Sequence, residues 1–336
     1  MVRASTVAKA RTESSPEALS SFLPGPPPPG VEPTFRFSGH QTFPLRIAWI
    51  PKALAEIVNG GDPLTNIDEG ITKLGLGKNM VEALRCWIEA FQIANRMNER
   101  WSLTRIGSLI FHPEKGLDPY LEDVSTSWLL HWLISTNTYS PFFAWECVFN
   151  RWPAMEFSGS QIIEAFEKES NRSPRPASPV TLRQHWEVFL HSYRPPRADK
   201  GEDHLDSALS ALRLIRNFGE RPNADGKWEN LYSFDLARKS SIPEKLFVFF
   251  VHDWWNRNYS SEQSTPLRDL VTGNHSPGRL LKMQESEIVQ RITEMSARQP
   301  KVFRIVESTS LRQLHRLQRS DGFDDLRAAY KAPSFV

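Results

Sequence analysis

The sequence predicts a mainly α-helical fold with a minor β component. In most segments that can pack, apolar side chains recur at the spacing of a helix, as at Val81, Leu84 and Ile88. Strand-like patterns are short, and they fall in a hairpin within 93–103 and in the alternating residues 301–306. The chain has 336 residues, a length that suggests two or three packing units.

Composition argues against several classes of protein. No run of about 18 apolar residues is present, so the sequence predicts no membrane-spanning helix. Residues 1–20 lack the apolar core of a secretory signal, and we therefore expect a cytoplasmic protein. The two cysteines, Cys86 and Cys147, have apolar neighbours and are expected to be reduced thiols in the core.

We expect residues 1–34 to form a disordered, proline-rich tail. The run 24–30 has the sequence PGPPPPG, which cannot continue a helix or a central strand. A stiff spacer and a polyproline ligand are both compatible with this run. Packing is expected to begin at Phe35.

The next unit, residues 35–116, carries helix and turn signals in a distinctive order. Asn66 stands three positions before a glutamate, as in a capping box, and opens a short helix. A glycine turn at 75–77 leads into a second helix over 78–91, which is followed by the hairpin of 93–103. Helix, turn, helix and hairpin in this order predict a winged helix-turn-helix domain.

In a domain of this kind the start of the second helix points into the DNA major groove. Lys78 and Asn79 hold those positions, and Arg85 lies on the polar face of the same helix. The hairpin, with Arg96 and Arg100, would lie along the DNA backbone as a wing. A protein-interaction module of the same shape is the alternative.

Residues 117–200 predict a helical, aromatic-rich connecting region and a second helix-turn-helix-like unit. The aromatic stripe between Trp128 and Trp152 is expected to form core or an interface between domains. Ser158 begins the second unit with a capping-box pattern, and its second helix would present Arg183 and Gln184 outward to DNA.

Residues 201–332 predict a mainly helical C-terminal domain. A strongly apolar run at 245–255 indicates a buried helix. The strand-like residues 301–306 precede an expected basic helix at 311–319, and together they could form a further winged-helix fragment.

Candidate catalytic groups are scattered, and the sequence has no metal-binding motif of known spacing. DNA cleavage usually needs carboxylates with a bound metal ion, here Mg²⁺ or Mn²⁺. Asp118, Glu122 and Asp123 are the candidate carboxylates. His40 is a candidate acid, base or hydrogen-bond donor to a phosphate. A helix cap, a turn or a satisfied histidine would explain each of them as well.

Three segments in order resemble a prokaryotic family first catalogued as a domain of unknown function. They are 37–46 (FSGHQTFPLR), 74–81 (LGLGKNMV) and 118–123 (DPYLED), the last followed by the sequence WLLHW at 128–132. A weaker match is SPGR at 276–279. The best-described members of the family are the SspB proteins, which are encoded beside DNA phosphorothioation genes.

The resemblance implies a role in bacterial anti-phage defence, in which sulfur replaces a non-bridging phosphate oxygen of DNA. An SspB-like protein would be the nicking endonuclease that opens double-stranded DNA for this exchange. The partners implied are a cysteine desulfurase, an ATP-using sulfur-transfer enzyme and an ATPase. The alternatives are a non-enzymatic DNA-binding adaptor or transcriptional regulator that recruits the modification enzymes, and a scaffold that binds only proteins.

The charge distribution bears on these alternatives. The formal net charge of the whole chain is only +2. Basic residues nevertheless outnumber acidic ones by 6 to 3 in 73–105, by 6 to 2 in 172–200 and by 6 to 1 in 298–319. We therefore expect local basic patches and a modest non-specific affinity for DNA.

Overall fold

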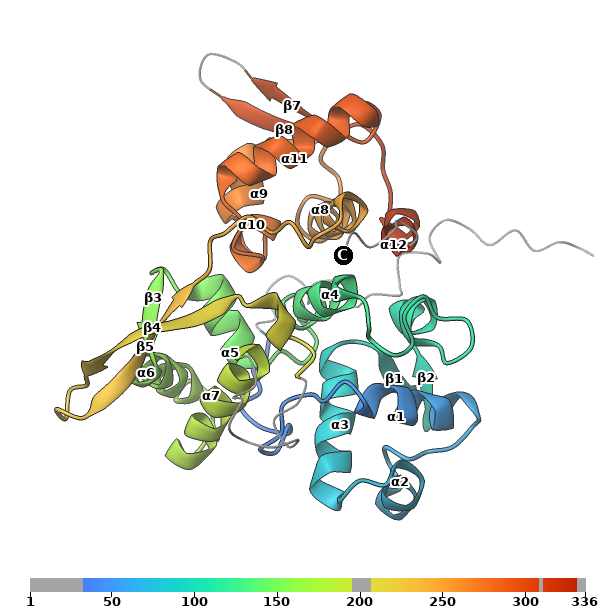
Figure 1. Ribbon diagram of the computed structural model, residues 1–336, viewed down its shortest axis with the longest axis vertical. Coiled ribbons are helices and arrows are strands. Elements are labelled where there is room, and N and C mark those ends of the chain that lie inside the picture. Colours follow the sequence, from blue (N-terminus) through green and yellow to red (C-terminus); the bar gives the residue numbers. More distant parts are fainter. Residues whose placement is uncertain (1–32, 195–206, 308–310, 331–336) are drawn as a thin grey trace, which may run out of the picture.

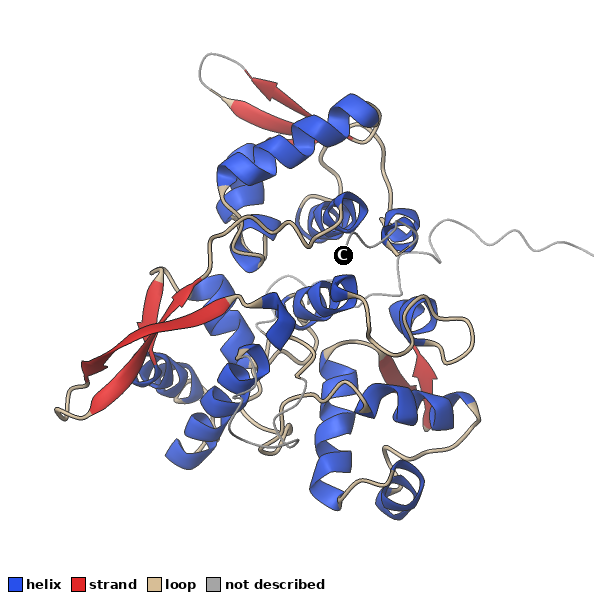
Figure 2. Cartoon of the chain, in the orientation of Figure 1, coloured by secondary structure: helices blue, strands red, loops and turns tan. Residues whose placement is uncertain are grey.

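The computed structural model describes residues 33–194, 207–307 and 311–330. About 48% of the described residues are helical and about 15% are strand, and these strands form three small antiparallel sheets. The protein is therefore an α+β mixture, and the prediction of a mainly α protein made of tandem winged helix-turn-helix units was wrong. Figure 2 shows that each sheet lies in a different part of the molecule.

The first part of the chain lies at the lower right of Figure 1. Its elements are α1 (Trp49–Val58), α2 (Ile67–Leu74), α3 (Lys78–Ala90), β1 (Ala94–Met97), β2 (Arg100–Leu103) and the π-helix η2 (Gly107–Phe111). The Asn66 side chain caps α2 by accepting from the Glu69 N–H, as the sequence predicts. Gly75 ends α2 in the left-handed conformation, with φ +66°, which glycine adopts without strain.

The middle part contains the aromatic stripe between Trp128 and Trp152 and a three-stranded sheet. Its elements are α4 (Val124–Ser135), α5 (Phe143–Trp145), the π-helix η3 (Glu146–Arg151), β3 (Glu156–Ser158), α6 (Gly159–Ser170), α7 (Pro179–Tyr193), η5 (Ser210–Leu212), β4 (Ile215–Pro222) and β5 (Trp228–Phe234). The expected capping box of α6 is present between Ser158 and Gln161. The sheet has the order β3-β5-β4, so a strand before α6 pairs with a hairpin far along the chain.

The last part lies at the top of Figure 1. Its elements are α8 (Glu244–Asn258), β6 (Ser264–Pro266), α9 (Leu267–Thr272), α10 (Pro277–Leu280), α11 (Glu285–Arg298), β7 (Phe303–Glu307), β8 (Arg312–Arg316) and α12 (Phe323–Ala329). The buried helix expected at 245–255 is α8.

The prediction of a basic helix at 311–319 was wrong. Residues 312–316 form β8, the central strand of a sheet with the order β6-β8-β7. Leu314 is fully buried, whereas Leu311 and Leu317 are each nearly half exposed. The three leucines therefore do not share the apolar stripe of a helix, and pairing on both edges fixes the segment as a strand.

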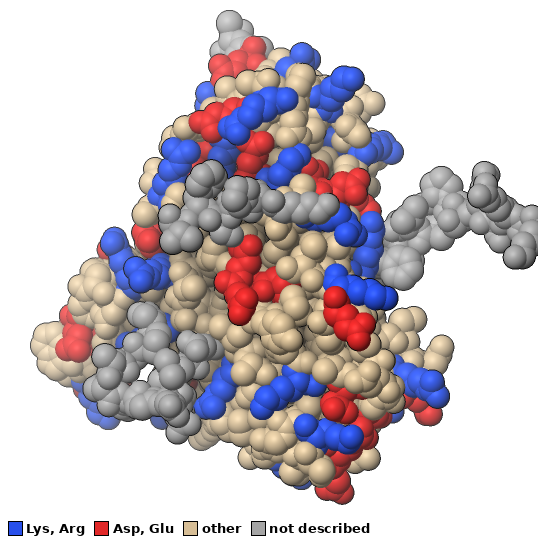
Figure 3. All heavy atoms as spheres, turned by 45° about the vertical axis from the view of Figure 1, so that its right-hand side comes forward, with Lys and Arg blue, Asp and Glu red and all other residues tan. Residues whose placement is uncertain are grey.

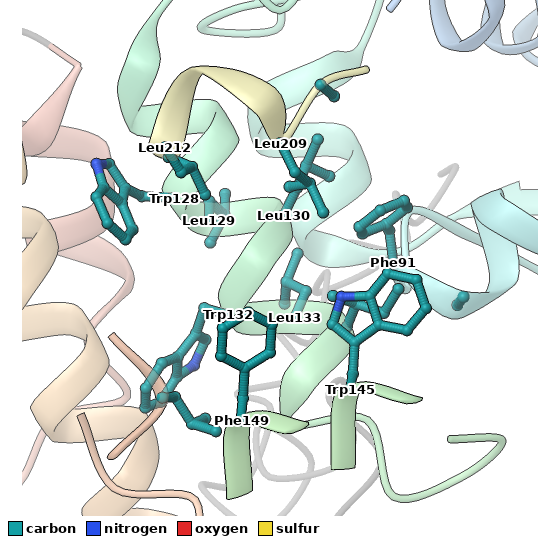
Figure 4. Close-up of a cluster of buried hydrophobic side chains, with 14 of the residues drawn as sticks. Phe91, Trp128, Leu129, Leu130, Trp132, Leu133, Trp145, Phe149, Leu209 and Leu212 are labelled. Carbon is teal, nitrogen blue, oxygen red and sulfur yellow. The ribbon is translucent and has the colours of Figure 1, made fainter. Parts of the chain in front are cut away.

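One continuous hydrophobic core joins the three parts. In Figure 4, Trp128, Leu129, Trp132 and Leu133 of α4 pack with Phe91, Trp145 and Phe149, and with Leu209 and Leu212 from beyond α7. These aromatic residues are buried, which confirms their prediction as core. Both cysteines are buried and free.

Some predictions fall wholly or partly outside the described residues. These are the proline-rich tail, of which only 33 and 34 are described, residues 195–200 of the expected connecting region, and residues 201–206, 308–310 and 331–332 of the expected C-terminal domain. Among the described residues, no helix has the length and apolar character needed to cross a membrane. The proposed domain boundaries stay predictions.

Candidate functional site

His40, the candidate acid or base, is enclosed in the core. It is 1% exposed, and its ring is nearly parallel to that of His185, at an interplanar angle of 4°. His40 Nε2 lies 2.8 Å from His185 Nδ1, and His40 Nδ1 lies 2.8 Å from the Gln41 carbonyl oxygen. The Ala144 N–H donates to His185 Nε2 over 3.0 Å.

This chain of hydrogen bonds assigns the tautomer of each ring. His185 Nε2 accepts, so His185 Nδ1 carries the proton and donates to His40 Nε2, and His40 Nδ1–H donates to the Gln41 carbonyl. Burial lowers the pKa of His40 to about 4, although the bond to the carbonyl acts in the opposite sense. Both rings are neutral, and every ring nitrogen has a partner, so the pair ties the 37–46 motif to α7.

Asp118 is a buried cap before α4. Its Oδ1 accepts from the Glu122 N–H over 2.9 Å, and its Oδ2 accepts from the Asp123 N–H over 3.1 Å and from the Thr126 hydroxyl. Asp123 is the N-cap of α4 and accepts from the Ser125 N–H. Glu122 is exposed. The 118–123 motif therefore shapes the turn into α4.

These carboxylates do not fit a resident Mg²⁺ ion. Mg²⁺ needs oxygen ligands with free lone pairs in octahedral geometry, whereas both oxygens of Asp118 already accept hydrogen bonds. Within 33–194, 207–307 and 311–330, no three His, Cys, Asp or Glu side chains are grouped so that they could hold a metal ion. The catalytic roles of His40, Asp118, Glu122 and Asp123 stay predictions.

The predicted DNA-binding residues are all exposed, on three elements. Lys78, Asn79 and Arg85 lie on α3, Arg96 and Arg100 lie on the β1–β2 hairpin, and Arg183 and Gln184 lie on α7. Arg85 and Arg96 line one cavity of about 260 Å³, while Arg183 lines a different cavity of about 490 Å³ between α6, α7 and the β4–β5 hairpin. The structure therefore brings only Arg85 and Arg96 to the same cavity.

We call the first cavity the arginine pocket. It is lined by Arg36, Gly39, Gln41, Thr65, Glu82, Arg85, Cys86, Glu89, Arg96 and Trp101. Gly39 and Gln41 belong to the 37–46 motif, so this motif forms one wall. Arg36 precedes the motif and was missed by the sequence analysis, although its position beside the motif is a signal that could have identified it.

Arg36 is held by several groups at once. Its Nη2 donates to Cys86 Sγ over 2.7 Å, its Nη1 donates to Ser140 Oγ over 3.2 Å, and its guanidinium lies 5.1 Å from the centre of the Phe142 ring. Gly39 has φ +109°, and a Cβ at this position would lie 2.4 Å from Arg36 Nη2. Only glycine combines this backbone conformation with the required space.

The pocket has a surplus of positive charge. Arg36 lies 3.8 Å from Glu89, and Gln41 donates to Glu82 over 2.8 Å. Burial raises the pKa of Glu89, and the nearby arginines oppose this shift. Arg85 and Arg96 have no hydrogen bond or ion pair among the described residues, so their guanidinium groups are available to an anion.

Basic and acidic side chains are interspersed over the face seen in Figure 3. No single-sign surface of the kind that binds DNA by charge alone covers this face.

Two of three comparisons with known proteins found matches to the chain. The family model described as "Protein of unknown function (DUF4007)" matches residues 37–330. Two solved structures, described as an SspB crystal structure and a magnesium ion-bound SspB crystal structure, align with TM-scores of 0.74 and 0.75. Each is 24% identical to the chain, and each alignment covers 87% of both chains. No curated protein matches the chain significantly. The chain therefore belongs to the DUF4007 family, and it has the fold of SspB.

Proposed function

We propose that this protein is the DNA strand-nicking subunit of a bacterial phosphorothioation system and acts in the cytoplasm in anti-phage defence. The observation that carries this proposal is the correspondence with the SspB fold, which extends over 87% of both chains. A correspondence of this extent includes all three parts of the molecule. The partners would be double-stranded DNA, a cysteine desulfurase, an ATP-using sulfur-transfer enzyme and an ATPase.

DNA would be held through its phosphates at the arginine pocket. Arg85 and Arg96 are exposed and available, and Arg36 adds a third guanidinium whose orientation is fixed by Ser140 and Cys86. Guanidinium groups bind phosphate oxygens by paired hydrogen bonds. Lys78, Asn79 and Arg100 would extend the interface along α3 and the hairpin, while Arg183 and Gln184 would bind DNA separately from α7.

A non-enzymatic adaptor is the second candidate function. It is favoured by one observation, which is that the Asp118 carboxylate serves as a cap and both of its oxygens are already bonded. An adaptor would bind DNA at the arginine pocket and leave cleavage to another subunit.

A plasmid assay separates the two functions. The purified full chain is incubated with supercoiled plasmid in Mg²⁺, in Mn²⁺ and in chelator, and relaxed circles are counted. Both cations are included because one of the SspB structures is described as magnesium-bound. Relaxed circles support the nicking function, whereas binding without relaxation in every condition leaves the adaptor.

The binding of DNA phosphates has its own test. In the Arg85→Ala/Arg96→Ala variant, the slope of log affinity against log salt should fall by about 2, because each arginine is expected to neutralise one phosphate. Arg268→Ala is the matched control, since Arg268 is an exposed arginine on α9, 84% accessible, that lines neither cavity. An unchanged slope in the double variant would remove the arginine pocket from the interface.

A further inference from the structure

A third cavity, of about 260 Å³, lies where segments from all along the chain meet. Its walls come from the N-terminal segment, the connection between α4 and α5, the π-helix η3, the end of α8 and residues 274–275. They are Pro33, Phe35, Thr136, Asn137, Thr138, Pro141, Glu146, Arg151, Arg257, Asn258, Asn274 and His275. Phe35 lines this cavity and its neighbour Arg36 lines the arginine pocket, so one segment borders both.

A carboxylate and an imidazole are paired in its wall. Glu146 Oε2 lies 2.7 Å from His275 Nε2, and Glu146 Oε1 accepts from Arg151 Nε over 2.8 Å and from Asn150 Nδ2 over 3.0 Å. Burial would raise the pKa of Glu146, but the hydrogen bonds from His275, Arg151 and Asn150 outweigh it and lower the pKa. Glu146 is therefore ionised and can only accept.

The proton on His275 is fixed by this pairing. Since Glu146 can only accept, His275 Nε2 must carry the hydrogen. The 3.3 Å approach of Asn150 Nδ2 to His275 Nε2 then joins two donors and is not a hydrogen bond. The two Asn150 amide hydrogens go to Glu146 and to Asn274 Oδ1, and Asn150 Oδ1 accepts from the His275 N–H over 2.9 Å.

The other ring nitrogen, His275 Nδ1, is left with a lone pair. Among the described residues, this nitrogen has no hydrogen-bond partner. It is also not buried, so it is accessible to solvent. The rings of His40 and His131 differ from it, because both nitrogens of each are bonded. His275 therefore lines the cavity and has one ring nitrogen that is open to solvent and can accept a proton.

Two guanidinium groups supply positive charge at the same cavity. Arg257 donates from Nε to Asp253 over 2.9 Å and from Nη1 to the Thr136 carbonyl over 3.1 Å, but its buried Nη2 has no partner. Arg151 pairs with Glu146 and keeps 42% of its side chain exposed. Both side chains line the cavity, so their positive charges would attract an anion bound there.

The local sequence fixes the position of His275. It adopts φ +49°, and the next residue, Ser276, caps α10 by accepting from the Arg279 N–H. Arg279 Nη1 donates to the Asn150 carbonyl over 2.6 Å, and a Cβ on Gly278 would lie 2.3 Å from the Val271 carbonyl oxygen. The SPGR segment therefore locks the loop of His275 onto η3.

We propose that this cavity is a phosphodiester-hydrolysing site in which His275 is the catalytic base and Glu146 is its positioning residue. His275 Nδ1 takes a proton from water while the water oxygen bonds to phosphorus. The bond from phosphorus to one sugar oxygen breaks, that oxygen takes a proton from solvent water, and His275 returns its own proton to the solvent. The products are a sugar hydroxyl and a phosphomonoester, while Arg151 and Arg257 stabilise the added negative charge. The inference rests on the nicking function and assigns its reacting group.

His275→Asn in the full-length protein is the decisive variant. Asparagine tolerates a positive φ, and it keeps the main-chain N–H that bonds Asn150, so the fold should survive. Plasmid nicking should fall at least about 100-fold with DNA affinity unchanged, as expected when a general base is removed. His315→Gln on β8 is the matched control and should nick at the normal rate. Nicking by His275→Asn within about 3-fold of the normal rate overturns the assignment.

Glu146→Gln and Glu146→Asp test the positioning role. The glutamine variant should lower kcat at least about 10-fold with little change in KM, and the aspartate variant should restore part of the activity. Equal decreases in the two variants, or an effect confined to KM, would contradict a positioning role and leave only a structural one. Thermal unfolding of each variant identifies a fold that has failed.

A small diester separates this inference from the proposed function. If the wild type leaves plasmid intact but hydrolyses bis(4-nitrophenyl) phosphate, and His275→Asn does not, the site is supported and the nicking function is refuted. If the wild type nicks plasmid and His275→Asn does so equally, only the site is refuted. If the wild type attacks neither substrate, both are refuted.

Discussion

Replacing His252 with leucine should make the protein less sensitive to acid. His252 is 1% exposed on α8, its ring centre lies 4.6 Å from that of Phe303, and its Nδ1 is buried with no partner. Its Nε2 lies 3.9 Å from the nearest oxygen of Asp325, too far for a hydrogen bond. Leucine has a similar volume, so the substitution should change the free energy of unfolding at pH 7.5 by less than about 1.5 kcal/mol.

The size of the acid effect follows from the pKa of this imidazole in the two states. Burial lowers the pKa of His252 to about 4, against the opposing charge of Asp325, whereas in the unfolded chain it is about 6.5. Between these values the unfolded state binds one more proton, so stability falls as the pH falls from 6.5 towards 4. At pH 5.0 the free energy of unfolding is lower by about 2 kcal/mol, because each of the about 1.5 pH units below 6.5 contributes about 1.4 kcal/mol.

Urea unfolding at pH 7.5 and pH 5.0 measures this decrease. The difference in the free energy of unfolding between the two pH values should be about 2 kcal/mol smaller in His252→Leu than in the wild type. Every other titrating group is present in both proteins, so its contribution cancels in this comparison. His315→Gln, a change to a half-exposed histidine, is the control and should keep the wild-type difference. Equal differences in the wild type and His252→Leu would refute the reasoning.

Three further substitutions test the packing and the buried charges. Gly107→Ala should lower the free energy of unfolding, measured by thermal unfolding, by about 3 kcal/mol, because a Cβ would lie 1.9 Å from the Ile93 carbonyl oxygen. Gly219→Ala is the matched control, because no atom lies within 4 Å of a Cβ at that position. Asp118→Ala should lower the free energy of unfolding, measured in urea, by about 3 kcal/mol, because it removes three hydrogen bonds. A decrease below about 1 kcal/mol would contradict the role of Asp118 as a cap. Burial lowers the pKa of Lys282 to about 7, so the unfolded state binds more protons between pH 7 and 10.5 and wild-type stability should rise with pH there. Lys282→Met should flatten that rise, and an equal rise in both proteins would exclude Lys282 as its source.

The helices and their caps were largely predictable, because their signals are local. The Asn66 cap, the turn at Gly75 and the helix beginning at Lys78 follow from residues within a few positions of one another. The same holds for the capping box at Ser158. Local spacing misled at 311–319, because an apolar residue at every third position fits a helix while the neighbouring strands select a different conformation.

The candidate sites were less predictable. Arg85 and Arg96 were expected to face DNA, and both reach the arginine pocket, but nothing in their spacing revealed that Gly39 and Arg36 form the opposite wall. His40 looked polar and available in the sequence, yet its pairing with His185, 145 positions away, encloses it. The burial of a polar residue depends on such distant partners.

By itself the sequence determined the amphipathic helices, their caps and turns, and the resemblance to SspB proteins, because each of these is written in short segments. Tertiary structure alone decided the two three-stranded sheets and the pairing of Glu146 with His275, which are 129 positions apart. The physical reason is that strand pairing and burial depend on which distant segments meet. The apolar core that brings those segments together also fixes which imidazole is enclosed and which keeps a free nitrogen.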